Sequence, residues 1–541
     1  MEFNNFPPFS QFASNLTFRF LILIFLFAPL FSFSQEKKKV KLIHTDELLY
    51  DEELVDAQRL IGNVHLEYEG TQFYCDSAYL FANDDFDAFS RIRIVDGANY
   101  NVTGDFMHFD KATKTSTLRS NITLRDKDMT LTTNDLTYNL DTEVASYFGG
   151  GKIVSNVNRN TLTSDKGYYH SKIQTFYFRK KVVLTNPEYV VKCDTMQYNN
   201  STEITYFFGP TTINGDKTSI YCENGYYNSK KDQSRFGKNA QVTSETTVLK
   251  GDSIFYDGKK GLGEVFRNVT IQDTTNNYII AGDYGRHLEA SKQSFVTGRA
   301  LMTQIFDNDS LFMHADTLKS FPDTSGHDVV YAFHHVKLFK HDLQGKCDSL
   351  VYSQQDSTLR MYNSPVLWSS QNQVTGDTLL LQSANGKLEK LYVKSNAYII
   401  SDAEAKGDSI SEPSGKYNQI KGRKMTGYFT DNDLSSVYVE GNGQLIYFPT
   451  DDKGEHPKAM GHNKGECSNI NITVKENQLT RIRMETETNS TFTPMKLSDK
   501  ETFLLDNFKW RGDERPMVME DIFIETEDAS SSSPQPSSSR R

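Results

Sequence analysis

The chain has 541 residues, a formal net charge of -11 and an isoelectric point near 5.6. This acidic balance argues against nucleic acid as a partner, because the chain offers no basic stripe that would neutralise phosphates. The 28 tyrosines and 36 phenylalanines, with many Thr, Ser, Val and Ile residues, favour strands over helices.

The chain begins with a segment typical of a secretory signal peptide. Arg19 precedes an apolar run over residues 20–31, and residues 32–34 are the small-residue site that a signal peptidase reads. The run is too short to span a bilayer comfortably. We therefore expect residues 1–34 to be a cleaved signal peptide, with a retained anchor as the alternative, and the mature chain to be exported and soluble.

A unit of about 30 residues then repeats along most of the chain. Its first half is an apolar-x-apolar strand after a pair such as Gly62-Asn63 or Ser120-Asn121, and its second half opens on a small residue and an acid, as in Cys75-Asp76. The acids fall at positions 76, 105, 135, 165, 194, 223, 252, 283, 316, 348, 377 and 408. A fixed period of this size predicts a stacked array, in which each unit buries its apolar face against its neighbours. We expect each acid to begin a strand at a turn and to stay solvated, with a cation-binding ladder of carboxylates as the alternative.

Within each unit, apolar residues alternate with polar ones at a period of two, which is the pattern of a half-buried strand. The residues expected to point inward are Val64, Leu66, Ile92, Ile94, Ile122, Leu124, Val182, Leu184, Val269, Ile271, Val336 and Leu338. Their neighbours, among them Thr123, Thr270 and Lys337, are expected to point outward.

Four of the five cysteines, at positions 75, 193, 222 and 347, occupy the small-residue position before the acid. Gly, Ser or Ala fills this position in other units, so the thiols serve there as small apolar side chains. We expect all five cysteines to be free.

No catalytic residues, metal site or cofactor are predicted. Gly251-Asp252-Ser253 resembles the first block of some serine esterases, but the repeat accounts for it, and no base and orienting acid accompany the serine. His334 and His335, with His341 nearby, form the densest histidine cluster. Adjacent residues of a strand face opposite sides, so the two are not expected to bind one metal ion.

We expect a single elongated all-β body. Residues 35–401 form the repeat array, 402–417 an inserted loop, 418–511 further units with a closing cap over 503–510, and 512–541 a disordered tail.

The alternation of Gly-Asn-Val-x-Leu with x-x-Asp-x-Leu-x-Tyr resembles the OstA/LptA family of lipopolysaccharide-transport proteins. Residues 417–422 and 439–444 are similar to the larger OstA-like proteins of Bacteroidetes-type bacteria, and the resemblance covers about residues 40–510. It implies an open β-jellyroll, or β-taco, of about thirteen units, whose apolar furrow holds the acyl chains of lipid A. The twelve inward residues would line this furrow. Unlike the outer-membrane member of the family, this chain is expected to lack a C-terminal outer-membrane barrel.

The resemblance also implies a location and partners. The location would be the periplasm, with association with the outer membrane as a further option. The partners would be lipopolysaccharide and other β-jellyroll transport proteins, which would pair with the edge strands at the inner- and outer-membrane ends.

Two other functions remain open from the sequence. A structural or adhesive β-solenoid would have a core sealed by stacked side chains and would carry no lipid. A carbohydrate-processing β-helix enzyme would need paired carboxylates on one face of a few neighbouring units, and no such units stand out.

Overall fold

The computed structural model describes residues 39–524, apart from 52–54, 97–99, 157–159, 276, 307–308, 354, 385–386, 405–413, 431–432, 452–457, 476–477 and 499–502. The expected signal peptide and most of the expected inserted loop lie outside the described residues. The chain divides into two compact units, an N-terminal one that ends at Phe266 and a C-terminal one that begins at Arg267.

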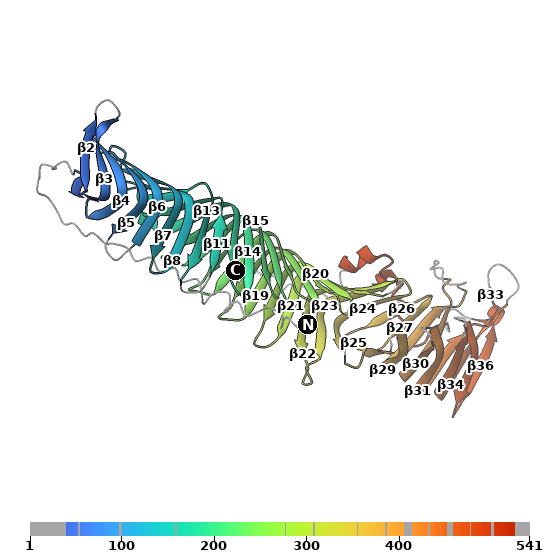
Figure 1. Cartoon of the computed structure of the whole chain (residues 1–541). Coiled ribbons are helices and arrows are strands. Elements are labelled where there is room, and N and C mark those ends of the chain that lie inside the picture. The colour runs from blue at the N-terminus through green and yellow to red at the C-terminus, as the bar shows by residue number, and fades with distance from the viewer. Residues whose placement is uncertain are drawn as a thin grey trace, which may run out of the picture. The chain divides into compact units, whose positions relative to one another are not determined.

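The N-terminal unit consists of antiparallel strands, with one 3-10 turn, η1 (Ser171–Ile173) (Figure 1). Its strands are β1(Lys41–His44), β2(Glu47–Asp51), β3(Val55–Tyr68), β4(Thr71–Phe81), β5(Phe86–Asp96), β6(Tyr100–Asp110), β7(Thr115–Asp126), β8(Met129–Asn139), β9(Val144–Tyr147), β10(Gly151–Ser155), β11(Thr161–Ser164), β12(Lys166–His170), β13(Thr175–Thr185), β14(Tyr189–Asn199), β15(Ile204–Gly215), β16(Ser219–Asn228), β17(Gln233–Thr243) and β18(Thr247–Asp257). The division between the units falls within β19(Leu262–Asp273).

The C-terminal unit continues the same pattern. Its strands are β20(Tyr278–Leu288), β21(Gln293–Ile305), β22(Ser310–Pro322), β23(Asp328–Lys340), β24(Leu343–Ser353), β25(Thr358–Tyr362), β26(Val366–Ser369), β27(Asn372–Thr375), β28(Thr378–Ala384), β29(Lys387–Asp402), β30(Tyr417–Thr430), β31(Asp433–Tyr447), β32(Thr450–Asp451), β33(Lys458–Ala459), β34(Gly461–Lys475), β35(Gln478–Glu485) and β36(Asn489–Pro494). Short 3-10 turns follow, among them η2(Met495–Leu497), η4(Gly512–Glu514) and η5(Met519–Phe523). The predicted all-β repeat fold is confirmed.

Each repeat unit is a pair of long antiparallel strands, such as β3 with β4 or β5 with β6. The acid lies in the middle of the second strand, since Asp76 is within β4 and Asp105 is within β6. The expectation that the acid begins a strand is therefore wrong. The four-residue segments at the strand ends, such as 82–85, make the turns instead.

Every long strand pair bends at its centre, and the bend divides each unit into two walls. Opposite Asp76, both residues of the Gly62-Asn63 pair have positive φ, and the pairing register shifts there by one residue. Two residues against one is a β-bulge, which bends the strand. Cys75 and Ala78 are both buried although they lie three residues apart, so the strand presents its inner face on both sides of the bend.

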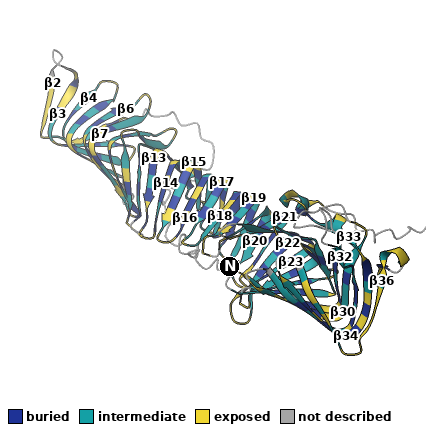
Figure 2. Cartoon of the chain, turned by 90° about the vertical axis from the view of Figure 1, so that its right-hand side faces the viewer, coloured by how far each residue is buried: buried dark blue, intermediate teal, exposed yellow. Residues whose placement is uncertain are grey.

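We call one of these walls wall A. It comprises the residues that precede the positive-φ pair on the first strand of a unit and the residues that follow the acid on the second strand. Wall B comprises the residues after the pair and before the acid. Figure 2 shows buried positions alternating with exposed ones along the strands. Among the described strands of the main sheet, the pairings join wall A to wall A and wall B to wall B, so no backbone hydrogen bonds close the side opposite the bend.

The segment Phe503–Ile524 differs from the expected cap and tail. Phe503 and Leu505 pack on Tyr398, Ile400 and other buried side chains on the outer face of wall B in the C-terminal unit. Farther along the segment, η4 and η5 contact the strands β21–β24 from the same side (Figure 1). Residues 503–510 therefore cover a sheet face instead of closing an end, and residues 512–524 are ordered; the remaining tail residues lie outside the described ones.

No helix in the described part of the chain has the length and apolar character that crossing a membrane requires.

Candidate functional site

The bends are held by hydrogen bonds between neighbouring units, in which the acid of one unit accepts from the positive-φ pair of the following unit. Asn121 donates from Nδ2 to Asp105 at 2.5 Å, and Asn239 donates in the same way to Glu223 at 2.8 Å. Where the pair ends in Arg91, the guanidinium takes the place of the amide and lowers the pKa of Asp76. The repeating acids therefore fasten the bend, and among the described residues no cluster of three metal-binding side chains occurs.

His334 and His335 occupy one of these bends, with φ values of 60° and 52°. His334 contacts Asp348 at 3.1 Å, and His335 contacts Asp316 at 2.9 Å, on the strand at the other side. Each histidine thus has a separate carboxylate partner.

Small side chains line the inside of the bend. All five cysteines are free and buried, as predicted, and burial raises the pKa of Cys193 to about 12. A Cβ atom added to Gly422 would lie 2.3 Å from Cγ1 of Val439. The neighbouring wall therefore leaves no room for a larger residue at this position.

The twelve predicted inward residues lie on wall B and face the interior between the walls. Eleven of them are buried, with exposures between 0% for Val64 and 6% for Leu184, whereas Leu124 is only half-buried. Thr123 and Thr270 are half-buried on the outer face, as predicted. Lys337 is an exception: its outward side chain is 5% exposed, because η5 covers it and accepts its hydrogen bonds.

Wall A supplies the other half of the interior, which was not included in the predicted site. Its buried residues include Leu60, Phe86, Met107, Phe109, Phe236 and Leu350. The available signal was the apolar pair two and four residues after each acid, as in Met107 and Phe109. Because this pair follows the bend, it faces the same interior as the residues of wall B.

Tyrosines recur on the inner side of wall A near its tips. They are Tyr138, Tyr169, Tyr198, Tyr227 and Tyr256. Burial raises the pKa of Tyr169 to about 12, and the hydroxyl of Tyr227 donates to Asp232 at 3.3 Å. The apolar interior is thus bordered by phenol groups on the side opposite the bend.

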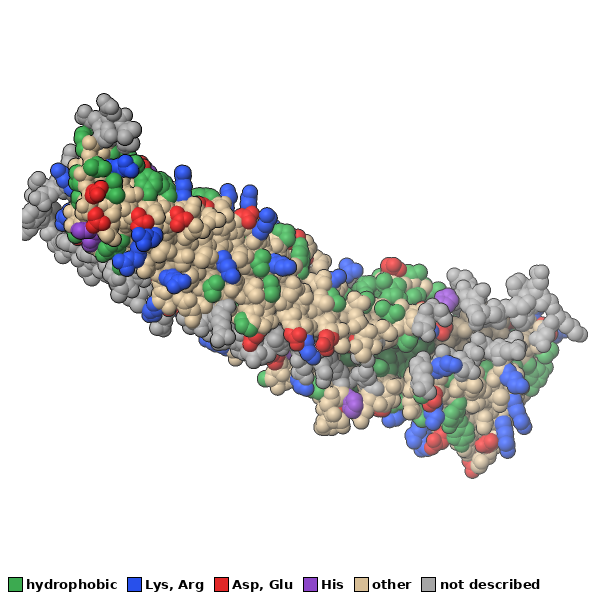
Figure 3. Space-filling model, in the orientation of Figure 1, with side chains coloured by type: hydrophobic (Ala, Val, Ile, Leu, Met, Phe, Trp, Pro, Cys, Tyr) green, Lys and Arg blue, Asp and Glu red, His purple; other side chains and the backbone are tan. Residues whose placement is uncertain are grey.

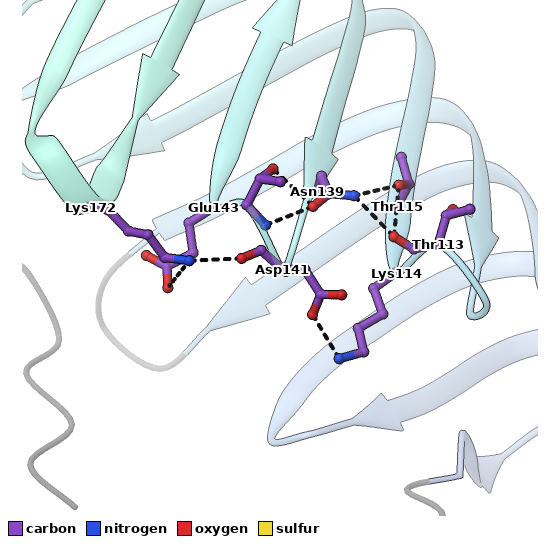
Figure 4. A network of polar contacts seen from close by, with 8 residues as sticks. Thr113, Lys114, Thr115, Asn139, Asp141, Glu143 and Lys172 are labelled. Atoms are coloured by element: carbon purple, nitrogen blue, oxygen red, sulfur yellow. Dashed lines mark hydrogen bonds and ion pairs between the residues drawn. The ribbon is translucent and has the colours of Figure 1, made fainter.

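The turns at the tips of wall A are joined to one another (Figure 4). Asn139 donates from Nδ2 to the carbonyl of Thr113 at 3.0 Å, and Lys114 forms an ion pair with Asp141 at 2.7 Å. Lys172 of the next turn donates to the carbonyl of Asp141 at 2.8 Å. These contacts fix the spacing of successive turns along the rim of wall A.

The two walls enclose an apolar interior. Both inner faces are apolar, and the edge between the wall tips is not closed by backbone pairing in the described residues. Ser253, the candidate nucleophile of the esterase-like block, is 9% exposed and accepts a hydrogen bond from Arg235. It occupies the position that Ser77 or Thr195 fills in other units.

Residues 37–194 match a family described as OstA-like protein. Among solved structures, the chain is similar to LptH from Pseudomonas aeruginosa, described as the LptA homologous periplasmic component of the conserved lipopolysaccharide transport device. The two are 18% identical over 20% of this chain and 82% of that one, with a TM-score of 0.19. No curated protein matches the chain.

Proposed function

Because the chain carries an OstA-like region over residues 37–194, we propose that it is a periplasmic bridge protein that holds lipopolysaccharide on its way to the outer membrane and supports the assembly of that membrane. The acyl chains of lipid A would lie between walls A and B, with the saccharide outside the open edge. The proposal is one of transport, without a chemical reaction.

The observation that carries the proposal is the apolar interior within each unit, whose edge is free of backbone pairing in the described residues. Ile122 and Val182, on strands of the N-terminal unit, are each 1% exposed and face this interior. Each methylene of an acyl chain gains about 0.8 kcal/mol when it leaves water for such surroundings. Entry requires the walls to part at the tips, where no strand pairing has to be broken.

Partners would bind at the ends of the sheet. In the described structure β1 and β2 pair with β3, and they expose Ile43, Leu48, Leu49 and Tyr50, each between 47% and 58%. Figure 3 shows hydrophobic side chains gathered at the end of the N-terminal unit that carries β2. An exposed strand edge with apolar side chains favours strand addition, so we propose that other β-jellyroll transport proteins pair here and at β36.

A photo-cross-linking residue placed at single positions tests the lipid proposal. In cells that make lipopolysaccharide, the residue at Ile122 or Val269 should form a lipid adduct. The matched outward positions Thr123 and Thr270, one residue away on the same strands, should not. Equal labelling of both faces, or no adduct at either inward position, would contradict the proposal and favour a structural scaffold.

A further inference from the structure

The outer faces of the two walls of the N-terminal unit differ in composition. Outer positions of wall A include Tyr79, Phe89, Phe106, Phe148, Tyr168, Tyr177, Tyr206, Phe208, Tyr226 and Phe255. On the outer face of wall B, from β3 to β18, the described Tyr and Phe residues are Tyr74 and Tyr221, and Thr, Val and Lys predominate. The β-propensity of aromatic residues would enrich both faces alike. The asymmetry therefore requires another reason.

The densest part of this face is a surface that we call the outer patch. It consists of Phe148, Lys166, Tyr168, Tyr177, Arg179 and Phe208. The rings of Phe148 and Tyr168 lie 5.5 Å apart, and the Lys166 ammonium is 5.6 Å from the centre of the Phe148 ring. Phe148 is 50% exposed and Phe208 is 44% exposed, so both rings are accessible.

The two cations of the outer patch lie directly opposite each other on β12 and β13. Like charges in this arrangement destabilise a sheet. Within the described residues neither cation forms an ion pair: Lys166 and Arg179 rest over the rings of Phe148 and Tyr168. Of the nearby carboxylates, Asp165 is paired with Lys181 at 3.7 Å, and Asp135 accepts hydrogen bonds from the backbone N–H groups of Phe148 and Gly149 at 2.6 Å. On a chain with a net charge of -11, this local excess of positive charge favours an anionic ligand.

We propose that the outer patch binds peptidoglycan, the cell-wall polymer of the compartment to which the chain is expected to be exported, whose linear glycan strands carry carboxylates on their peptide stems. The negative face of an aromatic ring attracts the polarised C–H groups on the face of a sugar ring, as it attracts other positively polarised groups. Lys166 and Arg179 would bind carboxylates along the polymer.

The dimensions suit a polymer that crosses the strands. Phe148 on the β9 side and Phe208 on β15 are separated by four strand spacings, roughly 19 Å. Similar groups flank the outer patch, with Arg119 over the Phe106 ring and Arg235 over the Phe266 ring. A linear ligand therefore meets rings and cations repeatedly along wall A.

The position of the outer patch favours the cell wall over the saccharide of lipopolysaccharide. Phe148 and Phe208 immediately precede the bend residues Gly149 and Gly209. They lie at the bend, at the opposite end of the wall from the edge where a saccharide would emerge. The binding of an anionic polymer at the outer patch needs only an exported chain; the lipid proposal enters only where the saccharide of lipopolysaccharide is set aside as the ligand.

Co-sedimentation of the full chain with purified, insoluble peptidoglycan tests the inference. The wild type should sediment with it, and both Phe148→Ala/Phe208→Ala and Lys166→Gln/Arg179→Gln should bind at least about tenfold more weakly, a loss of about 1.4 kcal/mol. Tyr221→Ala and Lys192→Gln, matched changes on the outer face of wall B, should bind as the wild type does. Far-UV circular dichroism checks that every variant is folded.

Three outcomes would overturn the inference. The wild type fails to sediment, the outer-patch variants sediment as well as the wild type, or neutral chitin is bound as tightly as peptidoglycan. Binding of soluble lipopolysaccharide saccharide through the same residues, without binding to peptidoglycan, would assign the outer patch to the substrate and also refute the choice of ligand. Lipid cross-linking at Ile122 is independent of all these results, so failure of one proposal can be told from failure of the other.

Discussion

At the scale of single residues, the repeat is specified at the bend. The positive-φ pair allows the strand to turn, the acid of the preceding strand accepts its hydrogen bonds, and a small residue leaves room where the walls meet. Asn is common in the pair because it tolerates positive φ and because its amide reaches the acid, as Asn121 reaches Asp105. The same three residue types therefore recur in most units for separate physical reasons.

The small-residue position gives a prediction at Gly422. In Gly422→Ala the new Cβ would lie 2.3 Å from Cγ1 of Val439, so Val439 or the backbone has to move. Overpacking of this kind costs about 1–3 kcal/mol, and we expect the free energy of unfolding in urea to fall by that amount.

Gly263→Ala is the matched control, because a Cβ at Gly263 has no neighbour within 4 Å. It should leave the free energy of unfolding nearly unchanged. If both variants were equally stable, the bend would be more adaptable than the packing indicates.

The sequence predicted the inward rows because period-two alternation follows directly from strand geometry. It did not predict the bend, because the register shift depends on the φ angles of residues such as Asn63 and Ser120, which no alternation pattern reports. For the same reason the alternation alone predicts strand starts at the acids and gives no indication that wall A faces the same interior as wall B. The bend converts two apolar rows, which a straight sheet would place on opposite faces, into a shared interior.

At the scale of elements, the segment Phe503–Ile524 is attached to wall B through buried amide side chains. Gln419 is 0% exposed; its Oε1 accepts from the backbone N–H of Leu505 at 2.9 Å, and its Nε2 donates to the carbonyl of Phe503 at 2.6 Å. Gln373 makes the corresponding pair of bonds with Arg511 and Lys509. The sequence did not predict that this segment covers wall B. Polar residues such as Gln373 and Gln419 at outward strand positions are equally compatible with a surface exposed to solvent.

Removal of the Gln419 amide should loosen this segment. Gln419→Ala leaves the amide of Leu505 and the carbonyl of Phe503 without these partners, and each buried unsatisfied group costs about 1–3 kcal/mol. We expect faster hydrogen exchange over residues 503–510, with the strands of the N-terminal unit unaffected. Gln444→Ala on the neighbouring strand β31 removes only a contact with Glu466 at 3.4 Å and should not change that exchange. Unchanged protection in Gln419→Ala would show that apolar contacts alone hold the segment.

The attachment of the same segment should depend on pH through Glu514. Hydrogen bonds and charges from Arg511 and Lys346 outweigh burial and lower the pKa of Glu514 to about 2, from an ordinary value of 4.5. A lowered pKa stabilises the folded state above pH 4.5, and this contribution is lost as the pH falls from 4.5 towards 2. It amounts to at most about 3 kcal/mol.

Fluorescence of Trp510, which packs beside Tyr417, can follow detachment in a Trp368→Phe background. Acidification from pH 6 to pH 3 should lower the urea concentration at which the signal changes. Glu514→Gln should abolish most of that pH dependence, whereas Glu520→Gln, at an exposed position of η5, should retain it. An equal pH dependence in the wild type and Glu514→Gln would assign the effect to other carboxylates.

At the scale of the whole molecule, the two-strand repeat makes the N-terminal unit modular. Each strand pair contacts mainly its neighbours, and the tips, bends and interior rows of successive pairs are equivalent. The residues 204–232 comprise β15, β16 and their turns, which is one complete repeat. Their deletion joins Glu203 at a wall A tip to Gln233, which begins the next equivalent strand.

The deletion of 204–232 should therefore give a shorter protein that still folds. We expect an unchanged far-UV circular dichroism shape, cooperative unfolding, and lipid cross-linking at Ile122 if the proposed function holds.

A deletion of 204–218, which removes β15 and one turn, is the contrasting variant. In this variant β16 would begin at the wall A tip and run towards wall B, opposite to its native direction. Glu223 would then have to take the place of a positive-φ pair, and the apolar residues of β16 would no longer face the interior on both walls. We expect that variant to aggregate or to unfold non-cooperatively. Equal tolerance of both deletions would mean that the strand order is not set by the alternation of bend pair and acid, because only that alternation distinguishes the first strand of a repeat from the second.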